Sequence, residues 1–395
     1  MIWKESKKNC KMNICLINPS FFPVRGGGEQ LTYDVAKELS NSNKVVIATE
    51  QLPNTKPIEI INNIKVYRAK TSKIPFLRLF LNQIYFYKML LKIIDKEKIN
   101  LLHMFHLFNL GGAAVLAKRK KKLKLITSLI GWDTYDPIKP VPKYAFPYMA
   151  WVMNNSDTVL TSSKHLLKSA RKQGARKQIP IISHGTNLHR IKQKTIDIKK
   201  KYNIKKDEKI VFSLQRLHKR KGLEYLILAA KKVLANKPNI KFIIGGKGPE
   251  LNNLKVLAKR LRLEKNIIFA GFIPDEELNN YYQTADLFSL PSLYEGFGIV
   301  YVDALINGLP IATTKCGGSE EMVNKSNGIL VKPKSSEQLA NAILEVLNKT
   351  WNKKEIKKNA EKYKWENIIK KYEEIYEKLS FSVSNNPKQH ILNPS

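Results

Sequence analysis

The residues best suited to chemistry lie in the stretch 289–310. Here Glu295-Gly-Phe-Gly298 follows a short apolar run and precedes an apolar helix. Glycines before a helix let the backbone approach a ligand closely, and the free N–H groups of the first helical turn favour an anion. Glu295 is a rigidly placed acceptor suited to hydroxyl groups. Asp303 follows about two helical turns later and can reach a second part of the same ligand. The pattern predicts a site for a sugar attached to a phosphate.

A second pair of charged residues, Arg216 and Lys221, is predicted at the carboxyl edge of a sheet. Arg216 follows the apolar strand 209–214, and Lys221 comes just before a helix that begins near Leu223. Ligands of parallel α/β sheets bind at this edge. An Arg for bidentate contact and a Lys as a point charge suit a departing diphosphate. In so basic a chain an Arg and a Lys at this spacing occur readily by chance. The prediction therefore rests on their position between a strand and a helix.

Glycine loops follow two other predicted strands. The strand 13–17 runs into a loop with Gly27 and Gly28 before a helix, and the strand 241–246 runs into a turn that contains Gly246. Such loops bring backbone N–H groups and a helix dipole towards a phosphate. The first loop lacks the Gly-x-Gly-x-x-Gly spacing of a nicotinamide site. A unit of strand, glycine turn and helix therefore recurs in both halves of the chain.

Together these motifs resemble the retaining glycosyltransferases of family 4. The resemblance matches Glu295 and Asp303 to the family's Glu-x7-Glu donor signature, although the second acid here is Asp, shorter by one methylene. It implies that Arg216 and Lys221 are catalytic residues that hold the donor diphosphate. It implies equally that Glu295 is catalytic and holds hydroxyls of the donor sugar, while Asp303 holds the ribose.

The resemblance also implies the rest of the donor site. The glycine loop after the first strand is expected to face the diphosphate across an interdomain cleft, and the loop 271–274 to bind the nucleobase. The donor-binding residues implied in this way are Gly27, Gly28, Gly246, Phe272, Ile273, Phe297, Gly298, Ile299 and Asp303.

In the N-terminal half, His103 and Asp133 are the residues predicted to contact the acceptor or the transferred sugar. His103 lies in the apolar strand 99–105, so a histidine with its hydrogen bonds satisfied in the core is the alternative interpretation. Asp133 belongs to a segment that resembles the family's His-Gly-x-Asp sequence, in which the His lies near the donor sugar. Ile130 stands at the position of that His, which is a departure from the family pattern.

The chain has 395 residues, too many for one ordinary core, so two domains are expected. The resemblance implies the GT-B fold, in which two Rossmann-like, doubly wound parallel-sheet α/β domains face a cleft. The N-terminal acceptor-side domain is predicted at 12–190 and the nucleotide-sugar-binding domain at 205–352, with a charged linker between them. A helix at 353–378 is expected to cross back to the N-terminal domain. The tail 379–395 is expected to be disordered.

The formal net charge is +36, and residues 1–200 contribute most of it, with 36 Lys and Arg against 12 Asp and Glu. Such a field attracts a membrane surface, nucleic acid or a phosphorylated substrate. A Lys/Ile/Asn-rich composition without functional meaning is an equal alternative. The stretch 74–92 mixes large apolar residues with Arg and Lys. It fits either an amphipathic helix on an anionic membrane or a helix packed against the sheet.

No apolar run approaches the length of a membrane span, and the three cysteines have neither metal-ligand nor disulfide spacing. We therefore expect a cytoplasmic protein, and peripheral attachment to the inner face of the cell membrane is a hypothesis drawn from its basic N-terminal half. Met12 is an alternative start, with residues 1–11 as an unstructured lead. No cofactor and no metal are expected, because no Asp-x-Asp sequence ends a strand and fixed cations supply the positive charge.

These features predict a hexosyltransferase that moves a sugar from a nucleotide diphosphate to a saccharide or lipid-linked acceptor, with retention, in surface-glycan or glycolipid assembly. A non-catalytic nucleotide-sugar-binding homologue would explain the departures at Ile130 and Asp303. A basic nucleic-acid-binding protein would explain the charge but not the glycine loops. A sugar-nucleotide epimerase or a phosphorylase-like enzyme on the same architecture would leave the pair Glu295 and Asp303 unexplained.

Overall fold

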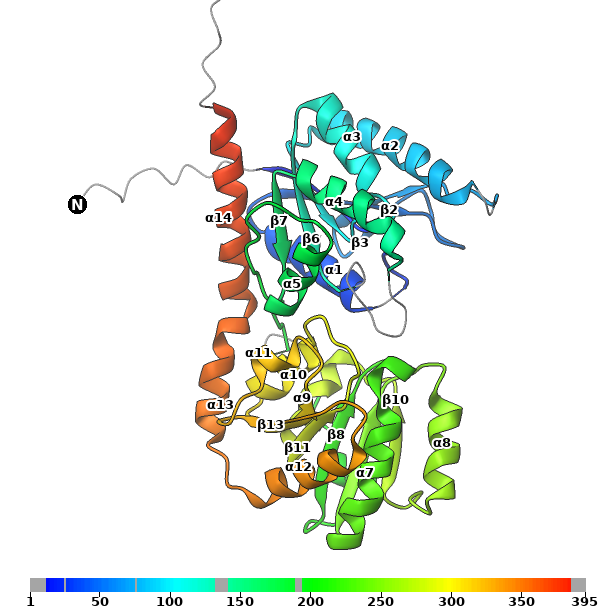
Figure 1. Ribbon diagram of the computed structural model, residues 1–395, viewed down its shortest axis with the longest axis vertical. Coiled ribbons are helices and arrows are strands. Elements are labelled where there is room, and N and C mark those ends of the chain that lie inside the picture. The colour runs from blue at the N-terminus through cyan, green and yellow to red at the C-terminus, as the bar shows by residue number, and fades with distance from the viewer. Residues whose placement is uncertain (1–11, 25, 75–76, 132–140, 189–193, 385–395) are drawn as a thin grey trace, which may run out of the picture.

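The computed structural model describes residues 12–24, 26–74, 77–131, 141–188 and 194–384, with side chains as far as residue 380. Within these residues the chain forms two α/β lobes, one above the other, and a long C-terminal helix runs along the side of the N-terminal lobe (Figure 1).

The N-terminal lobe is built on a seven-stranded sheet in the order β3-β4-β2-β1-β5-β6-β7. Its strands are β1 (Asn13–Ile17), β2 (Lys44–Glu50), β3 (Ile58–Ile61), β4 (Ile64–Ala69), β5 (Leu101–Phe105), β6 (Lys124–Leu129) and β7 (Thr158–Thr161). Its helices are α1 (Gly27–Leu39), α2 (Arg78–Glu97), α3 (Gly111–Lys121), α4 (Phe146–Asn155) and α5 (Lys164–Lys172). All pairings are parallel except that of β3 with β4. The turns after β1, β5, β6 and β7 therefore meet at one edge of the sheet.

The C-terminal lobe has a six-stranded, fully parallel sheet in the order β10-β9-β8-β11-β12-β13. Its strands are β8 (Lys209–Leu214), β9 (Ile240–Gly245), β10 (Ile267–Gly271), β11 (Leu287–Leu290), β12 (Ile311–Thr314) and β13 (Gly328–Val331). Its helices are α6 (Ile198–Lys201), α7 (Leu223–Asn236), α8 (Leu251–Arg260), α9 (Asp275–Thr284), α10 (Ile299–Ile306), α11 (Ser319–Met322) and α12 (Ser336–Asn348). The strand order reverses between β8 and β11, which is where ligands bind in such sheets.

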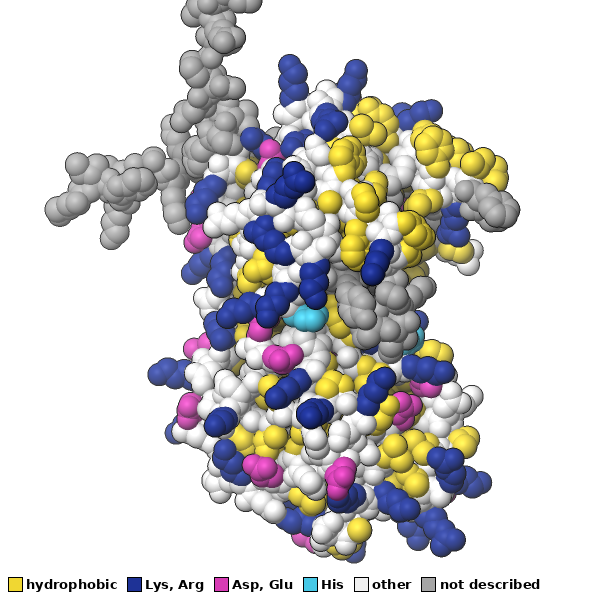
Figure 2. All heavy atoms as spheres, viewed as in Figure 1, with side chains coloured by type: hydrophobic (Ala, Val, Ile, Leu, Met, Phe, Trp, Pro, Cys, Tyr) yellow, Lys and Arg dark blue, Asp and Glu magenta, His cyan; other side chains and the backbone are white. Residues whose placement is uncertain are grey.

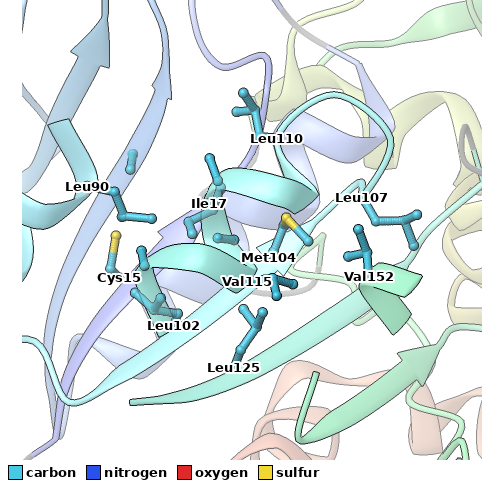
Figure 3. Packing of buried hydrophobic residues seen from close by; sticks show 14 of the residues in the cluster. Cys15, Ile17, Leu90, Leu102, Met104, Leu107, Leu110, Val115, Leu125 and Val152 are labelled. Carbon is cyan, nitrogen blue, oxygen red and sulfur yellow. The ribbon is translucent and has the colours of Figure 1, made fainter. Parts of the chain in front are cut away.

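Apolar side chains from the helices hold each sheet edge in place. On one face of the N-terminal sheet, Leu90 of α2, Val115 of α3 and Val152 of α4 pack with Ile17 and Met104 of the central strands (Figure 3). Burial of each such side chain contributes about 1.5–3 kcal/mol. The strand ends that carry the predicted site residues are therefore anchored in a continuous core.

The C-terminal segment consists of α13 (Lys353–Ala360), a short 3₁₀ turn and α14 (Trp365–Ser384). Trp365, Tyr372 and Tyr376 of α14 are buried against the other face of the N-terminal sheet, so the helix returns to the N-terminal lobe as expected. The predicted single helix 353–378 is interrupted between the lobes, because the chain there pairs with the interlobe segment: Thr186 N–H donates to the Tyr363 carbonyl at 2.9 Å. Helical structure continues to Ser384, and residues 385–395 of the predicted tail lie outside the described residues.

Three further details differ from the expectations. The antiparallel edge strand β3 was not expected. The segment predicted as a charged linker between the two domains is more than a linker, because Ile198 and Ile204 are buried in the core of the C-terminal lobe. Gly27 and Gly28 lie within the first turn of α1 rather than in the loop before it. In the described part of the chain, no helix is both long enough and apolar enough to cross a bilayer.

Candidate functional site

The Glu295 turn connects β11 to α10 and is held in place by its backbone. Glu295 N–H donates to the Cys316 carbonyl at 2.8 Å, and the Glu295 carbonyl accepts from Gly318 N–H at 2.9 Å. Gly298 begins α10 with a φ of 87°, and a Cβ atom at this position would lie 2.9 Å from Glu295 Cγ. Only glycine satisfies both conditions. The turn therefore fixes the direction of the Glu295 side chain and leaves the first N–H groups of α10 without helical partners.

Lys221 and Glu295 form an ion pair at the carboxyl edge of the C-terminal sheet. Their Nζ and Oε2 atoms are 2.5 Å apart, and each side chain is 15% exposed. Ser292 Oγ donates to the same carboxylate oxygen at 3.3 Å. The other oxygen of Glu295 has no such contact among the described residues, so it can accept from a ligand hydroxyl. Arg216 lies at the end of β8 and is exposed, and within the described residues no ion pair engages it. The predicted charged residues thus come to one edge.

The turns after β8 and β9 interlock beside this pair. Gly246 has a φ of 118°, and a Cβ atom there would lie 1.8 Å from the Gln215 carbonyl oxygen. Gly246 N–H donates to the Gly271 carbonyl at 2.6 Å, and this hydrogen bond joins the end of β10 to the turn after β9. Phe272 then projects with 56% of its surface exposed, whereas Ile273 is buried. An exposed ring at this edge can stack on a nucleobase, whereas Ile273 can offer a ligand only its backbone.

On the N-terminal lobe, Gly28 of α1, His106 and Ile130 form a wall that faces the Glu295 turn. A Cβ atom at Gly28 would lie 2.6 Å from His106 Nε2 and 3.2 Å from Ile130 Cδ1. A Cβ atom at Gly296 would lie 3.3 Å from the Ile130 carbonyl oxygen. The first turn of α1, the end of β5 and the end of β6 therefore lie directly beside the Glu295 turn.

Hydrogen bonds join the two lobes around this site. Ser163 Oγ at the start of α5 donates to the Gly296 carbonyl at 2.8 Å. Glu321 of α11 accepts from the Lys164 N–H at 2.6 Å and from the His165 N–H at 3.3 Å. In Figure 1, α5 lies at the lower end of its lobe, next to α10 and α11. The N-terminus of one helix thus fixes the Glu295 turn to the opposite lobe.

Asp303 lies on α10 and is held by the interlobe segment. Thr186 Oγ1 donates to Asp303 Oδ1 at 2.6 Å, and the carboxyl is half-buried. Burial raises the pKa of Asp303 to about 7, the Thr186 hydrogen bond opposes this shift, and the negative field of Asp275 adds to it. Near neutral pH this carboxyl can therefore exchange a proton when a ligand binds.

The geometry described above agrees with the comparisons to known families. Residues 25–190 match the model described as Glycosyltransferase Family 4, and residues 194–363 match the model described as Glycosyl transferases group 1. The two models together account for most of the chain. The chain belongs to the family 4-like glycosyltransferases of group 1.

Two of the curated relatives of this glycosyltransferase match about half of it. An uncharacterised glycosyltransferase of Methanocaldococcus jannaschii is 34% identical over 47% of this chain and 48% of its own length. The alpha-monoglucosyldiacylglycerol synthase of Streptococcus pneumoniae is 31% identical over 50% of this chain and 44% of its own length. The matched segments thus span about half the length of these relatives.

Solved structures match nearly the whole glycosyltransferase in fold. Sucrose-phosphate synthase from Thermosynechococcus elongatus has a TM-score of 0.80 at 22% identity, covering 94% of this chain and 100% of that one. HepE of Anabaena, in complex with UDP and glucose, has a TM-score of 0.75 at 21% identity with the same coverages. The two-lobed architecture is therefore the GT-B fold.

The structure speaks against one of the two acceptor-side predictions. His103 is fully buried in the core of the glycosyltransferase: its Nδ1 lies 2.5 Å from Tyr376 Oη and its Nε2 lies 2.7 Å from Ser128 Oγ. Burial lowers the pKa of His103 to about 3, so the ring is neutral. The prediction that His103 contacts acceptor or sugar is wrong, because the returning helix α14 covers it, and the alternative of a core histidine is confirmed. Asp133 lies outside the described residues.

Sequence reasoning missed two residues of this site, His106 and Thr186. His106 directly follows β5 and has a φ of 68°, and such left-handed backbone in a non-glycine residue is concentrated at functional sites. Its place just after a predicted strand was a usable signal. Thr186 follows a glycine in the interlobe segment, and nothing in its local sequence indicated a bond to a residue 117 positions away.

The donor-side glycines differ in what their positions require. A Cβ atom at Gly28 would require the His106 ring to shift, whereas a Cβ atom at Gly27 would meet no atom within 4 Å. Phe297 is buried and its ring lies 4.6 Å from that of His184, and Ile299 is the first residue of α10.

Within the described residues, no group of three or more His, Cys, Asp or Glu side chains could hold a metal ion.

Proposed function

We propose that this protein is a retaining hexosyltransferase that uses a nucleoside-diphosphate sugar as donor. The observation that carries the proposal is the Lys221–Glu295 ion pair beside the exposed Arg216 and the open start of α10. Two fixed cations and free helix N–H groups suit a diphosphate, and a carboxylate between them and the opposite lobe suits sugar hydroxyls.

In the proposed reaction, the bond between the anomeric carbon and the diphosphate oxygen breaks, and its electron pair stays on that oxygen. Lys221 and Arg216 stabilise the negative charge that develops there. The acceptor hydroxyl attacks the anomeric carbon from the same face, and its proton passes to the departing oxygen. Glu295 orients the donor sugar through its hydroxyl groups. We propose that no metal is needed, because the two side chains supply the positive charge that a metal would otherwise bring.

The nature of donor and acceptor is drawn from similar proteins. The HepE structures contain UDP or UDP-glucose, which supports a uridine nucleotide as the first donor to test. The S. pneumoniae relative is a synthase of a glucosyl diacylglycerol, which supports a lipid or lipid-linked acceptor. We therefore place the reaction in glycolipid or surface-glycan assembly, at the inner face of a membrane in the cytoplasm.

A donor panel tests the proposal. UDP-, GDP-, ADP- and TDP-sugars are scored for thermal stabilisation and for slow hydrolysis, with the anomeric configuration of the released sugar followed by NMR. We expect one nucleotide class to stabilise the protein and to turn over with retention, in the presence of EDTA. Lys221→Ala and Arg216→Ala should lose about 10²–10³-fold in rate. Lys219→Ala, an exposed lysine in the same 3₁₀ turn, is the matched control.

Two other outcomes would select the alternatives. Donor binding without hydrolysis or transfer would indicate a non-catalytic nucleotide-sugar-binding homologue. An absence of response to every nucleotide sugar, combined with tight and salt-sensitive binding to RNA or DNA, would indicate a nucleic-acid-binding protein.

A further inference from the structure

Exposed apolar side chains gather on one layer of the N-terminal lobe. Among the described residues, fourteen large hydrophobic side chains are exposed, and eight of them belong to the layer formed by α2, α3, α4 and the residues just before α2 and α4. These eight are Ile74, Leu77, Leu79, Phe80, Tyr85, Leu116, Tyr144 and Trp151. Figure 2 shows apolar surface gathered over the region where Figure 1 places these helices. We refer to these eight residues as the apolar layer.

Much of this exposure arises because only the later turns of α2 pack against the sheet. Its later turns bury Phe86, Leu90 and Ile93 against the sheet, as expected of a packed helix. Its first turn extends beyond the rest of the lobe (Figure 1), so Leu79 and Phe80 meet no core, and Phe80 remains 66% exposed. The later part of the sequence 74–92 is thus a helix packed against the sheet. The earlier part leaves large apolar side chains exposed to solvent. Exposed apolar surface of this extent marks an interaction site.

Specific contacts hold the three helices of the layer together. Gln83 Nε2 of α2 donates to Tyr148 Oη of α4 at 2.8 Å, and the same oxygen accepts from the Gly112 N–H of α3 at 2.8 Å. The ring of Tyr148 stacks on that of Trp151 at 6.3 Å, and the Arg119 guanidinium lies 5.7 Å from the Trp151 ring. The three helices that carry most of the apolar layer are therefore joined by specific contacts.

The surroundings of the layer are strongly positive. Residues 70–124 contain 13 Lys and Arg and only 2 acidic residues. Asp95 is paired with Lys121 at 2.6 Å, and Glu97 with Lys44 and Lys65 at 2.8 Å. Both acidic side chains are thus neutralised by lysines, and the remaining lysines and arginines leave a net positive field around the apolar side chains.

We propose that this layer docks the protein on an anionic lipid bilayer. Apolar side chains enter the interface between headgroups and acyl chains, while Lys and Arg side chains contact the acidic headgroups. A second copy of the chain fits less well, because a symmetric contact would bring two positive surfaces together. Nucleic acid would match the charge but would leave Leu79 and Phe80 without a partner. The inference deepens the proposed function, because a lipid acceptor would be met where the protein docks.

Vesicle flotation tests the docking. The probes are vesicles of phosphatidylcholine alone and of phosphatidylcholine with 30 mol% phosphatidylglycerol, at physiological salt. We expect the protein to float with the anionic vesicles only. The double variant Leu79→Ser/Phe80→Ser should reduce the partition coefficient at least ~10-fold, since each side chain contributes apolar area to the interface. Val256→Ser, which alters a 67% exposed side chain on α8 of the other lobe, is the matched control and should float as the parent does.

A pair of charge variants and one further readout complete the test. Lys88→Glu/Lys92→Glu should also reduce flotation, and added salt should weaken the binding of the parent protein. The proposal is overturned if the parent protein does not float, or if the serine variant floats equally well. A change of oligomeric state in the serine variant would point to a second copy instead. Thermal stabilisation by UDP-glucose is measured on every variant, so that loss of docking and loss of donor binding are distinguished.

Discussion

At the scale of single residues, the half-buried carboxyl of Asp303 links proton binding to the stability of the fold. Its pKa is raised by burial to about 7, so it carries a proton over a range in which the unfolded chain has lost it. Between pH of about 4 and 7 the folded state therefore binds the extra proton, and stability falls as pH rises through this window. Asp34 of α1 has its pKa raised to about 7 by burial as well, so two carboxyls share the window.

If Asp303 accepts hydrogen bonds from a ribose, the ionised form should bind the nucleotide better. We predict that UDP affinity rises by up to about tenfold between pH 6 and pH 8 in the parent protein. Asp303→Asn should remove most of this dependence. The measurement is isothermal titration calorimetry with UDP at several pH values.

A variant of Thr186 tests whether Asp303 causes the pH dependence of UDP affinity. The Thr186 hydrogen bond favours the ionised form of Asp303, so Thr186→Val should raise its pKa and move the midpoint of UDP affinity to higher pH. An unchanged pH profile in Asp303→Asn would assign the dependence to Asp34 or to the ligand itself.

His106 is the residue of the N-terminal wall whose side chain can donate or accept a hydrogen bond, and in the proposed function it lies on the side of the donor sugar. We predict that His106→Ala weakens UDP-glucose binding by about 5- to 20-fold, the value of one or two net hydrogen bonds. Binding of UDP alone should be unchanged. Calorimetric titration of both ligands provides the comparison.

A histidine at the neighbouring position 130 should compensate for the loss of the His106 side chain. Its Cδ1 and His106 Nε2 both lie against the Cβ position of Gly28, so a histidine at either position points to the same space. Ile130→His in the His106→Ala background should therefore restore part of the affinity for UDP-glucose. An equal loss for UDP and UDP-glucose in His106→Ala would show that the histidine only supports the fold.

The positions of His103 and His106 in the structure show what the local sequence cannot predict about single residues. His103 lies within β5 and His106 directly follows it, and the local sequence does not tell which of them a distant helix covers. Tyr376, which fills the space beside His103, is 273 residues away along the chain. By contrast, the Glu295 turn was predictable, because its chemistry depends on residues that are close in sequence: two glycines, one carboxylate and the start of a helix.

At the scale of elements, α14 packs its aromatic side chains on the N-terminal core, and Tyr376 adds a buried hydrogen bond to His103. Tyr376→Phe would leave a buried nitrogen of His103 without its partner. We predict that the variant lowers the free energy of unfolding by about 1–3 kcal/mol. Tyr372→Phe is the matched control: its ring lies in the same buried stripe, and within the described residues its hydroxyl has no hydrogen-bond partner. Urea unfolding followed by circular dichroism measures both, and equal effects of the two variants would refute the role of the hydrogen bond.

Elements with strong local patterns were predictable, and those defined by distant partners were not. The parallel strands appear in the sequence as short apolar runs followed by glycine turns. The edge strand β3 alternates between exposed and partly buried residues and pairs on one side only, so its sequence carries little signal. The break between α13 and α14 depends on pairing with Thr186, which the helical pattern of 353–378 does not reveal.

At the scale of the whole molecule, α5 connects the N-terminal lobe to the Glu295 turn of the C-terminal lobe. Ser163 caps this helix by accepting from the Leu166 N–H at 3.2 Å. Its second bond, to the Gly296 carbonyl, and the Glu321 contacts could not be expected, because they join residues more than 130 positions apart. The arrangement of the lobes is thus fixed by contacts that only the folded chain brings together.

Glu321 provides the means to test this connection. Its carboxylate accepts two N–H groups at the positive end of α5, an interaction that typically contributes about 0.5–2 kcal/mol. Because the carboxylate belongs to the other lobe, its removal should favour separation of the lobes rather than melt the helix, whose cap Ser163 remains. We predict that Glu321→Ala increases the radius of gyration of the unliganded protein in small-angle X-ray scattering.

The same variant should bind UDP about 2- to 10-fold more weakly, because part of the binding free energy is then used to bring the lobes together. With saturating UDP, its radius of gyration should return to that of the parent. Glu320→Ala removes the adjacent exposed carboxylate, for which no hydrogen bond occurs among the described residues, and should leave both quantities unchanged. If Glu321→Ala lowers affinity without any change in scattering, its effect is local to α5, and the contact does not control how the two lobes meet around the donor.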